Sequence, residues 1–166
     1  MLKGNLIMIT AKWVMGDSDM QDARKIRTKV FIEEQGFSAQ REFDDIDSIA
    51  LHVIIYKGPE ACATGRLYYR QGYRIGRIAV LKEERGTGLG DLTVRMLLFK
   101  AFEQEAEEVT VLAQLQAQGF YEKFGFISTG EQEEDEGVPH IIMKVNPQTA
   151  RLTGSVKTVQ IKRTAI

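Results

Sequence analysis

The chain of 166 residues has a single cysteine, Cys62, and only two histidines. One thiol cannot form an internal disulfide, which fits a reducing compartment. No cluster of cysteine and histidine predicts a metal site, and no Ser/His/Asp arrangement predicts a hydrolase. Because Cys62 stands in a strand-like stretch, we interpret it as an inert packed residue and not as a nucleophile.

Long apolar runs are also missing. No segment approaches the roughly 18 apolar residues that indicate a membrane span, and residues 1–10 lack the length and cleavage site of a signal peptide. Hydrophobic residues make up 43% of the chain and charged residues 27%, as in ordinary globular proteins, and the length predicts one domain. We therefore expect a cytoplasmic protein without membrane partners.

The net charge of −1 hides an asymmetry along the chain. Residues 146–166 contain four cations and no acid, so residues 1–145 carry a charge of −5. An acidic body of this kind argues against nucleic-acid binding. The alternating pattern of residues 155–162 would suit an extra edge strand, which could join two copies in a homodimer; a disordered tail is the alternative.

The most informative segment is the glycine-rich stretch Arg-Gly-Thr-Gly-Leu-Gly at residues 85–90. It follows an apolar run at residues 75–80 and opens an apolar segment at residues 89–102, which predicts strand, connection, turn and helix. Glycines let the backbone pass close to a ligand, and a helix N-terminus offers unpaired N–H groups to phosphate. Arg85 adds a fork-shaped cationic donor. We therefore predict that this turn binds a phosphorylated cofactor.

The spacing of the glycines distinguishes between phosphate-binding motifs. A Walker loop requires a Gly-Lys-Ser/Thr triplet, which the chain lacks. Counted from Gly86 and Gly88, the third glycine of a dinucleotide fingerprint is replaced by Asp91, whose charge would face the pyrophosphate. The fingerprint also follows its strand directly, whereas five residues separate Val80 from Gly86. Both nucleotide-binding motifs therefore match poorly.

The pattern Arg-x-x-Gly-x-Gly after a strand-ending valine instead resembles the pyrophosphate loop of the GNAT N-acetyltransferases, which bind acetyl-CoA. A second stretch is similar to the same superfamily. Residues 109–113 read as a buried strand, followed by Gln114, where the family more often has Asn, and by the signature Tyr-x-x-x-Gly-Phe at Tyr121, Gly125 and Phe126. The ElaA/YjcF-like branch is indicated by three further segments, residues 31–35, 42–47 and 137–141.

The resemblance implies an α+β fold: a mixed, mostly antiparallel central sheet of about six or seven strands, flanked by about four helices. The sheet is splayed between its fourth and fifth strands, which we expect to part beyond Val80 and Ala113. The resemblance covers residues 5–146, which we take as the GNAT domain, and leaves residues 147–166 as a basic extension of unknown role. The order of segments agrees with this fold. A helix capped by Ser18 and Gln21 should end at Gly36, and a polar loop should follow it.

In this superfamily the cofactor lies in the splay. The residues that the resemblance assigns to acetyl-CoA are Ile78, Ala79, Val80, Arg85, Gly86, Thr87, Gly88, Leu89, Gly90, Gln114 and Tyr121. The strand ending at Val80 would pair with pantetheine and polarise the thioester carbonyl through its N–H groups. Tyr121 is the family's position for protonating the CoA thiolate, and a phenol pKa of about 10 is close to that of a thiol. Simple core packing is the alternative for this side chain.

A general base for the amine is less clearly marked. Glu34 ends the first helix, a region that borders the acceptor site in the superfamily. His140 could relay protons, although a structural role in its strand is equally consistent with its apolar neighbours. Asp44, Asp45 and Asp47 could attract a cationic amine or simply keep a loop solvated. A water chain without any side-chain base is the remaining alternative.

The sequence thus predicts an acetyl-CoA-dependent N-acetyltransferase, which moves an acetyl group to a primary amine by direct attack on the thioester. A non-catalytic acyl-CoA-binding module would keep the glycine loop but would not need Tyr121, so the presence of Tyr121 favours catalysis. A nucleotide-binding regulatory domain is disfavoured by the spacings. The acceptor stays open among small amines, amino sugars, polyamines, peptide N-termini and lysine side chains.

Overall fold

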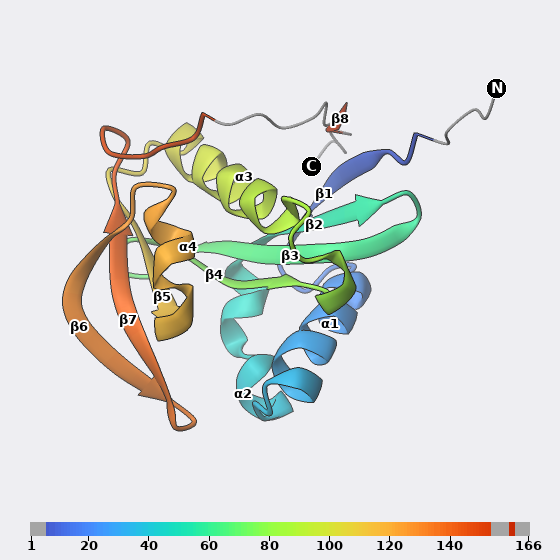
Figure 1. Ribbon diagram of the computed structural model, residues 1–166, viewed down its shortest axis with the longest axis horizontal. Coiled ribbons are helices and arrows are strands. Elements are labelled where there is room, and N and C mark those ends of the chain that lie inside the picture. The colour runs from blue at the N-terminus through green and yellow to red at the C-terminus, as the bar shows by residue number, and fades with distance from the viewer. Residues whose placement is uncertain (1–5, 154–159, 162–166) are drawn as a thin grey trace.

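The computed structural model describes residues 6–153 and 160–161, which form one mixed sheet with helices on both faces (Figure 1). The strands are β1 (Ile9–Met15), β2 (Leu51–Lys57), β3 (Glu60–Tyr69), β4 (Tyr73–Val80), β5 (Val109–Gln114), β6 (Ile127–Asp135), β7 (Val138–Val145) and β8 (Gln160–Ile161). The helices are α1 (Gln21–Arg27), α2 (Ala39–Glu42), α3 (Leu89–Glu103) and α4 (Gln118–Glu122). The other helical elements are the π-helix η1 (Thr28–Glu34) and the 3₁₀ helices η2 (Asp45–Ile49), η3 (Lys82–Glu84) and η4 (Leu115–Ala117). The predicted α+β fold is confirmed.

The sheet order is β6-β7-β5-β4-β3-β2-β1-β8, and only the β4–β5 and β1–β8 pairs are parallel. Helix α3 covers one face and α1 the other, so β3 is buried on both sides over most of its length. Leu97 and Leu98 of α3 are fully buried against the first face, and Ile26 of α1 is buried against the second. Each such side chain stabilises the fold by about 1.5–3 kcal/mol.

The sheet splits between β4 and β5. Their ladder has three pairs and ends at Ile75–Val111, so the strands part earlier than the expected points at Val80 and Ala113. A β-bulge explains the difference, since the register of β4 against β3 shifts around Arg77. Arg77 has a positive φ of 51°, and a bulge of this kind bends its strand and interrupts the ladder. The splay itself is confirmed.

The segment between β1 and β2 departs from its prediction. Helix α1 starts at Gln21 without a side-chain cap, and Ser18 Oγ donates instead to the Met15 carbonyl, so the capping box was wrong. The helix continues as the π-helical η1, and Gly36 follows it with a φ of +78°. The predicted polar loop contains α2 and η2, because Glu42 and other acids of this segment are buried by arginines.

The chain beyond β7 stays in contact with the body. The Arg151 amide donates to the Phe124 carbonyl, and a Cβ at Gly125 would meet the Thr149 carbonyl oxygen at 2.1 Å. Of the predicted edge strand at residues 155–162, only β8 belongs to the described residues, where it pairs with β1; the rest lies outside them. Among residues 6–153, none of the helices is both long and apolar enough to cross a bilayer.

Candidate active site

A cavity of about 610 Å³ lies at the split between β4 and β5. Every residue that the sequence assigned to the cofactor lines this cavity except Thr87, whose hydroxyl donates to the Glu84 carbonyl. His140 lines it as well, but Glu34 does not. The structure therefore brings together two motifs that lie far apart in the sequence, the glycine loop and the segment around Tyr121.

The glycine loop lines one end of the cavity. Gly86 and Gly88 have φ values of +76° and +88°, conformations that other residues rarely adopt, and a Cβ on either would meet no atom within 4 Å. Gly88 is the N-cap of α3, whose first hydrogen bond runs from the Leu92 amide to the Gly88 carbonyl. The preceding N–H groups are thus without helical partners, and the open space and the donors fit a phosphate group.

Arg85 is held in place beside this loop. Its Nη2 donates to Glu34 Oε1 at 2.9 Å, and its Nε donates to the Val80 carbonyl at 3.1 Å. The arginine therefore joins the loop to both the end of η1 and the end of β4. The candidate base Glu34 is already occupied by this ion pair and stands outside the cavity.

The walls of the cavity are the parted strands. Gly76, Ala79 and Val80 of β4 stay paired with β3 on either side of the bulge, but residues 76–80 have no β5 partner, so one backbone edge faces the cavity. On the opposite wall, Leu112 and Gln114 of β5 remain paired with β7. Gln114 Nε2 donates to Gln35 Oε1 at 2.8 Å, so this side chain joins β5 to the residue that follows η1. An unpaired backbone edge can bind an extended amide-containing chain as an added strand.

Tyr121 lies in α4 and is only 7% exposed. Its ring packs edge-on against Phe120 and Phe126, with centroids 5.1 and 5.6 Å away. Burial raises the pKa of the Tyr121 phenol well above the ordinary value that the sequence interpretation assumed. The group therefore stays protonated near neutral pH. It can donate a hydrogen bond to a developing anion, but complete proton transfer from it to a thiolate is uphill in the free protein.

His140 sits in β7, opposite Gln114 of β5 in the ladder. Its Nδ1 lies 2.8 Å from the Val138 carbonyl oxygen. A carbonyl can only accept, so Nδ1 carries the proton and Nε2 of the neutral ring is left with its lone pair. Of the two predicted bases, only this one reaches the cavity.

A buried charge network beside the cavity was not predicted. Arg27 is fully buried and donates to Glu42 Oε1 and Asp47 Oδ1, both at 2.8 Å. Arg66 donates to Asp47 and to Asp44, so neither aspartate is free to attract an amine. A signal did exist, because Arg27 falls on the apolar stripe of α1 between Ile26 and Val30, and a charge there needs a buried partner.

The pKa values of these acids follow from burial and pairing. Burial raises the pKa of Glu42 despite the nearby charges of Arg77 and Arg27. Burial also favours a higher pKa for Asp47. Hydrogen bonds and charges of Arg27 and Arg66 outweigh this effect and hold the pKa of Asp47 below its ordinary value. Over residues 6–153 and 160–161, no three His, Cys, Asp or Glu side chains gather as metal ligands would.

Comparisons with known proteins agree with this geometry. The acetyltransferase (GNAT) domain model matches residues 17–147. The uncharacterized N-acetyltransferase YjcF of Bacillus subtilis (strain 168) is 33% identical over 129 residues, which are 76% of this chain and 92% of YjcF. The crystal structure of Escherichia coli ElaA superposes with a TM-score of 0.72 at 27% identity, over 82% of this chain and 99% of ElaA.

A second solved structure is also similar to this chain. An acyl-CoA N-acyltransferase from Pseudomonas aeruginosa superposes with a TM-score of 0.70 at 25% identity, over 81% of this chain and 98% of that one. The family match spans most of the chain, and the relatives are matched over nearly their whole length. The chain therefore belongs to the GNAT acetyltransferases, as a transferase of their ElaA/YjcF-like branch.

Proposed function

We propose that this protein is an acetyl-CoA-dependent N-acetyltransferase that acetylates a primary amine by direct attack on the thioester. The observation that carries the proposal is the cavity at the split of the sheet, which both the glycine turn before α3 and Tyr121 line. In this proposal residues 5–146 form the catalytic domain. Acetyl-CoA supplies the activated acyl thioester. The name of the Pseudomonas aeruginosa relative, an acyl-CoA N-acyltransferase, supports the same cosubstrate class.

The binding residues divide by their chemistry. Backbone N–H groups from Gly86 to Gly90, with Arg85, would hold the pyrophosphate. The free edge of Ile78, Ala79 and Val80 would pair with the pantetheine amides, and Gln114 faces it from the other wall. Because Arg85 already contacts Glu34 and Val80, its donors must be shared or released when an anion binds.

In this proposal a small number of groups carry out the catalytic steps. N–H groups on the free edge of β4 stabilise the oxyanion that forms when the amine attacks. The protonated Tyr121 phenol donates a hydrogen bond to the departing sulfur. His140 Nε2 is the side-chain atom best placed to accept the proton of the amine, directly or through water.

An amine array tests the proposal. Purified protein should bind acetyl-CoA in calorimetry and release free thiol when acetyl-CoA is mixed with a substrate amine. Binding without thiol release across the array would favour the alternative, a non-catalytic acyl-CoA-binding module. Absence of acetyl-CoA binding would refute both.

A further inference from the structure

Arg77 occupies an unusual position in β4. Its φ of +51° is rare for a residue other than glycine, and strained conformations of this kind persist mainly at functional sites. The bulge at Arg77 begins directly after the last β4–β5 pair, Ile75–Val111. The distortion that separates the strands is thus the one that sets the direction of the Arg77 side chain, which lines the cavity.

The Arg77 guanidinium is fixed but not fully used. Its Nε lies 3.2 Å from both the Glu42 carbonyl oxygen and Glu42 Oε2, and its Nη2 donates to the Arg41 carbonyl at 3.1 Å and to Asp44 Oδ2 at 3.2 Å. Its Nη1 has no hydrogen-bond partner within residues 6–153, and the side chain is 24% exposed. A guanidinium held on one side offers its remaining N–H groups in a defined direction.

The acids that line the cavity are all paired. Glu42 binds Arg27 and Arg77, and Glu84, Asp91 and Asp135 bind Lys57, Lys123 and Arg41. The lining of the described residues therefore has no unpaired carboxylate for a cationic group, whereas Arg77, although paired with Glu42 and Asp44, keeps its Nη1 donors. The group that complements such donors is an oxyanion.

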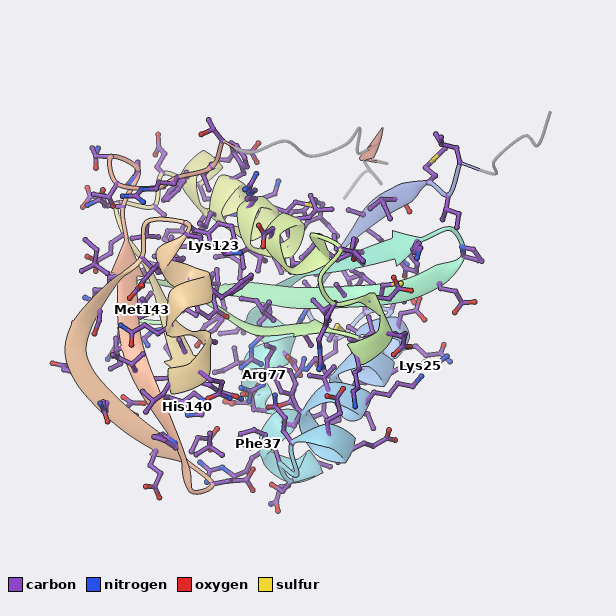
Figure 2. The ribbon with its side chains drawn as sticks, in the orientation of Figure 1. Lys25, Phe37, Arg77, Lys123, His140 and Met143 are labelled. Atoms are coloured by element: carbon purple, nitrogen blue, oxygen red, sulfur yellow. The ribbon has the colours of Figure 1, made fainter. Side chains whose placement is uncertain are left out.

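This end of the cavity has both charged and apolar side chains. Figure 2 shows Arg77, Phe37 and His140 around the space between the β4–α2 wall and the β5–β7 wall, and all three line the cavity. Close by, the Ser38 amide donates to Glu136 Oε2 at 3.0 Å, and Arg41 pairs with Asp135 at 3.1 Å. These contacts tie the α2 segment to the β6–β7 hairpin beside the cavity, which suits a small molecule better than a protein chain.

We propose that Arg77 binds an oxyanion carried by the acceptor, so that the acceptor is a small amine bearing a carboxylate or a phosphate, such as an amino acid or an amino sugar phosphate. The inference rests on the proposed function, because it places the acceptor in the same cavity as the thioester. Arg77 would act as a specificity-determining residue, not as an acid or base.

The test compares pairs of amines in which one member carries an oxyanion and the other a neutral group at the same position. The probes are amino acids with their amides, such as L-leucine and L-leucinamide, and glucosamine 6-phosphate with glucosamine. The wild type should acetylate one anionic member with a lower KM than its neutral partner. Arg77→Asn, a residue that tolerates positive φ, should raise that KM by about 10- to 100-fold while leaving the KM of the neutral partner unchanged.

Two further variants separate recognition from folding. Arg77→Lys keeps the charge but loses the fork, so it should restore KM only in part. Arg70→Asn removes an exposed arginine that pairs with Asp45 outside the cavity and should change nothing. Acetyl-CoA affinity, measured by calorimetry, should be equal in all four proteins.

Three results would overturn the inference. Turnover confined to amines without an oxyanion, spermidine included, would do so, as would equal KM values for both members of every pair. The proposed function would survive both results if acetyl-CoA still binds and an amine is acetylated. A wild type that fails to bind acetyl-CoA would refute the proposed function, and the inference with it.

Discussion

Arg85 Nη2 lies 2.9 Å from Glu34 Oε1, so the cation of the glycine loop is paired with the acid at the end of η1. Both side chains are partly exposed, at 44% and 32%. An ion pair of this exposure contributes only about 0–1 kcal/mol to stability, so an incoming pyrophosphate can readily take the place of Glu34. Glu34 therefore competes with phosphate for Arg85 and is not positioned to accept a proton in the cavity.

Glu34→Gln should consequently strengthen CoA binding. Removing the competing carboxylate frees Arg85 and lowers the negative charge beside the phosphates, and the gain should be about two- to fivefold in Kd. Calorimetry at low and high salt measures it, since added salt should shrink the gain. A large fall in kcat with unchanged Kd would instead restore Glu34 as the base.

Gly90 allows a charge test of the glycine loop. It lies in the first turn of α3, has no positive φ, and a Cβ there would make only ordinary contacts of 3.5 Å with Phe120 and Val80. Gly90→Glu and Gly90→Gln should therefore both fold and differ only in charge. We expect Gly90→Glu to bind CoA at least tenfold more weakly than Gly90→Gln. Equal affinities of the two variants would place the phosphates elsewhere.

The parts of the fold that were predictable rest on local patterns. Gly58 and Pro59 punctuate the β2–β3 hairpin, and the run from Leu89 predicts α3 nearly to its end. The Arg77 bulge has no comparable local signature. It depends on how β4 meets β3 and on a guanidinium fixed by groups more than 30 residues away, including Asp44.

The candidate site likewise has parts that local motifs predict and parts that depend on distant residues. The glycine loop and Tyr121 were predicted because each belongs to a short sequence motif, and both line the same cavity. The buried pair of Arg27 and Glu42 was not, because a charge is stable in the core only with a partner, and sequence does not say which partner folding supplies. The ion pair of Glu34 was not predicted for a related reason, since its partner Arg85 is 51 residues away.

Tyr121→Phe should lower kcat without harming the fold. The hydroxyl makes no hydrogen bond within the described part of the chain, and the ring contacts with Phe120 and Phe126 are retained, so stability should change by less than about 0.5 kcal/mol. Loss of the donor to the leaving sulfur should reduce kcat by about 10²- to 10⁴-fold, with little change in acetyl-CoA affinity.

The matched control for Tyr121 is Tyr73→Phe. Tyr73 also presents a phenol, but its hydroxyl donates to the Gln104 carbonyl at 3.2 Å, outside the cavity. This variant should turn over at the wild-type rate. Near wild-type kcat in Tyr121→Phe would mean that a hydrogen bond from Tyr121 does not stabilise the departing sulfur.

His52 should make stability depend on pH. It is 1% exposed, its Nε2–H donates to the Asp47 carbonyl, and burial lowers its pKa. The unfolded chain therefore takes up a proton at higher pH than the folded protein. The stabilisation is complete above the ordinary histidine pKa of about 6.5 and is lost as pH falls toward the lowered value.

Urea unfolding of His52→Gln isolates this contribution. Between about pH 7.5 and about pH 5.5, the wild type should lose more stability than the variant, which has no group titrating at that position. Asp44 and Asp47, whose pKa values are also lowered, add their loss only at lower pH, while Glu42 has the opposite slope. Parallel pH profiles for the two proteins would show that His52 is not buried as a neutral ring.

The last prediction concerns the free edge of β4. Backbone N–H groups of residues 78–80 that point away from β3 lack β5 partners, so these amides should exchange readily until a ligand pairs with them. Acetyl-CoA at one hundred times its Kd should stabilise the fold by about 2.7 kcal/mol through mass action alone. Hydrogen exchange should slow most at residues 78–80 and 85–90, and less at Gln114, whose strand stays paired with β7. Protection at residues 42–47 with an unchanged glycine loop would refute this cofactor site.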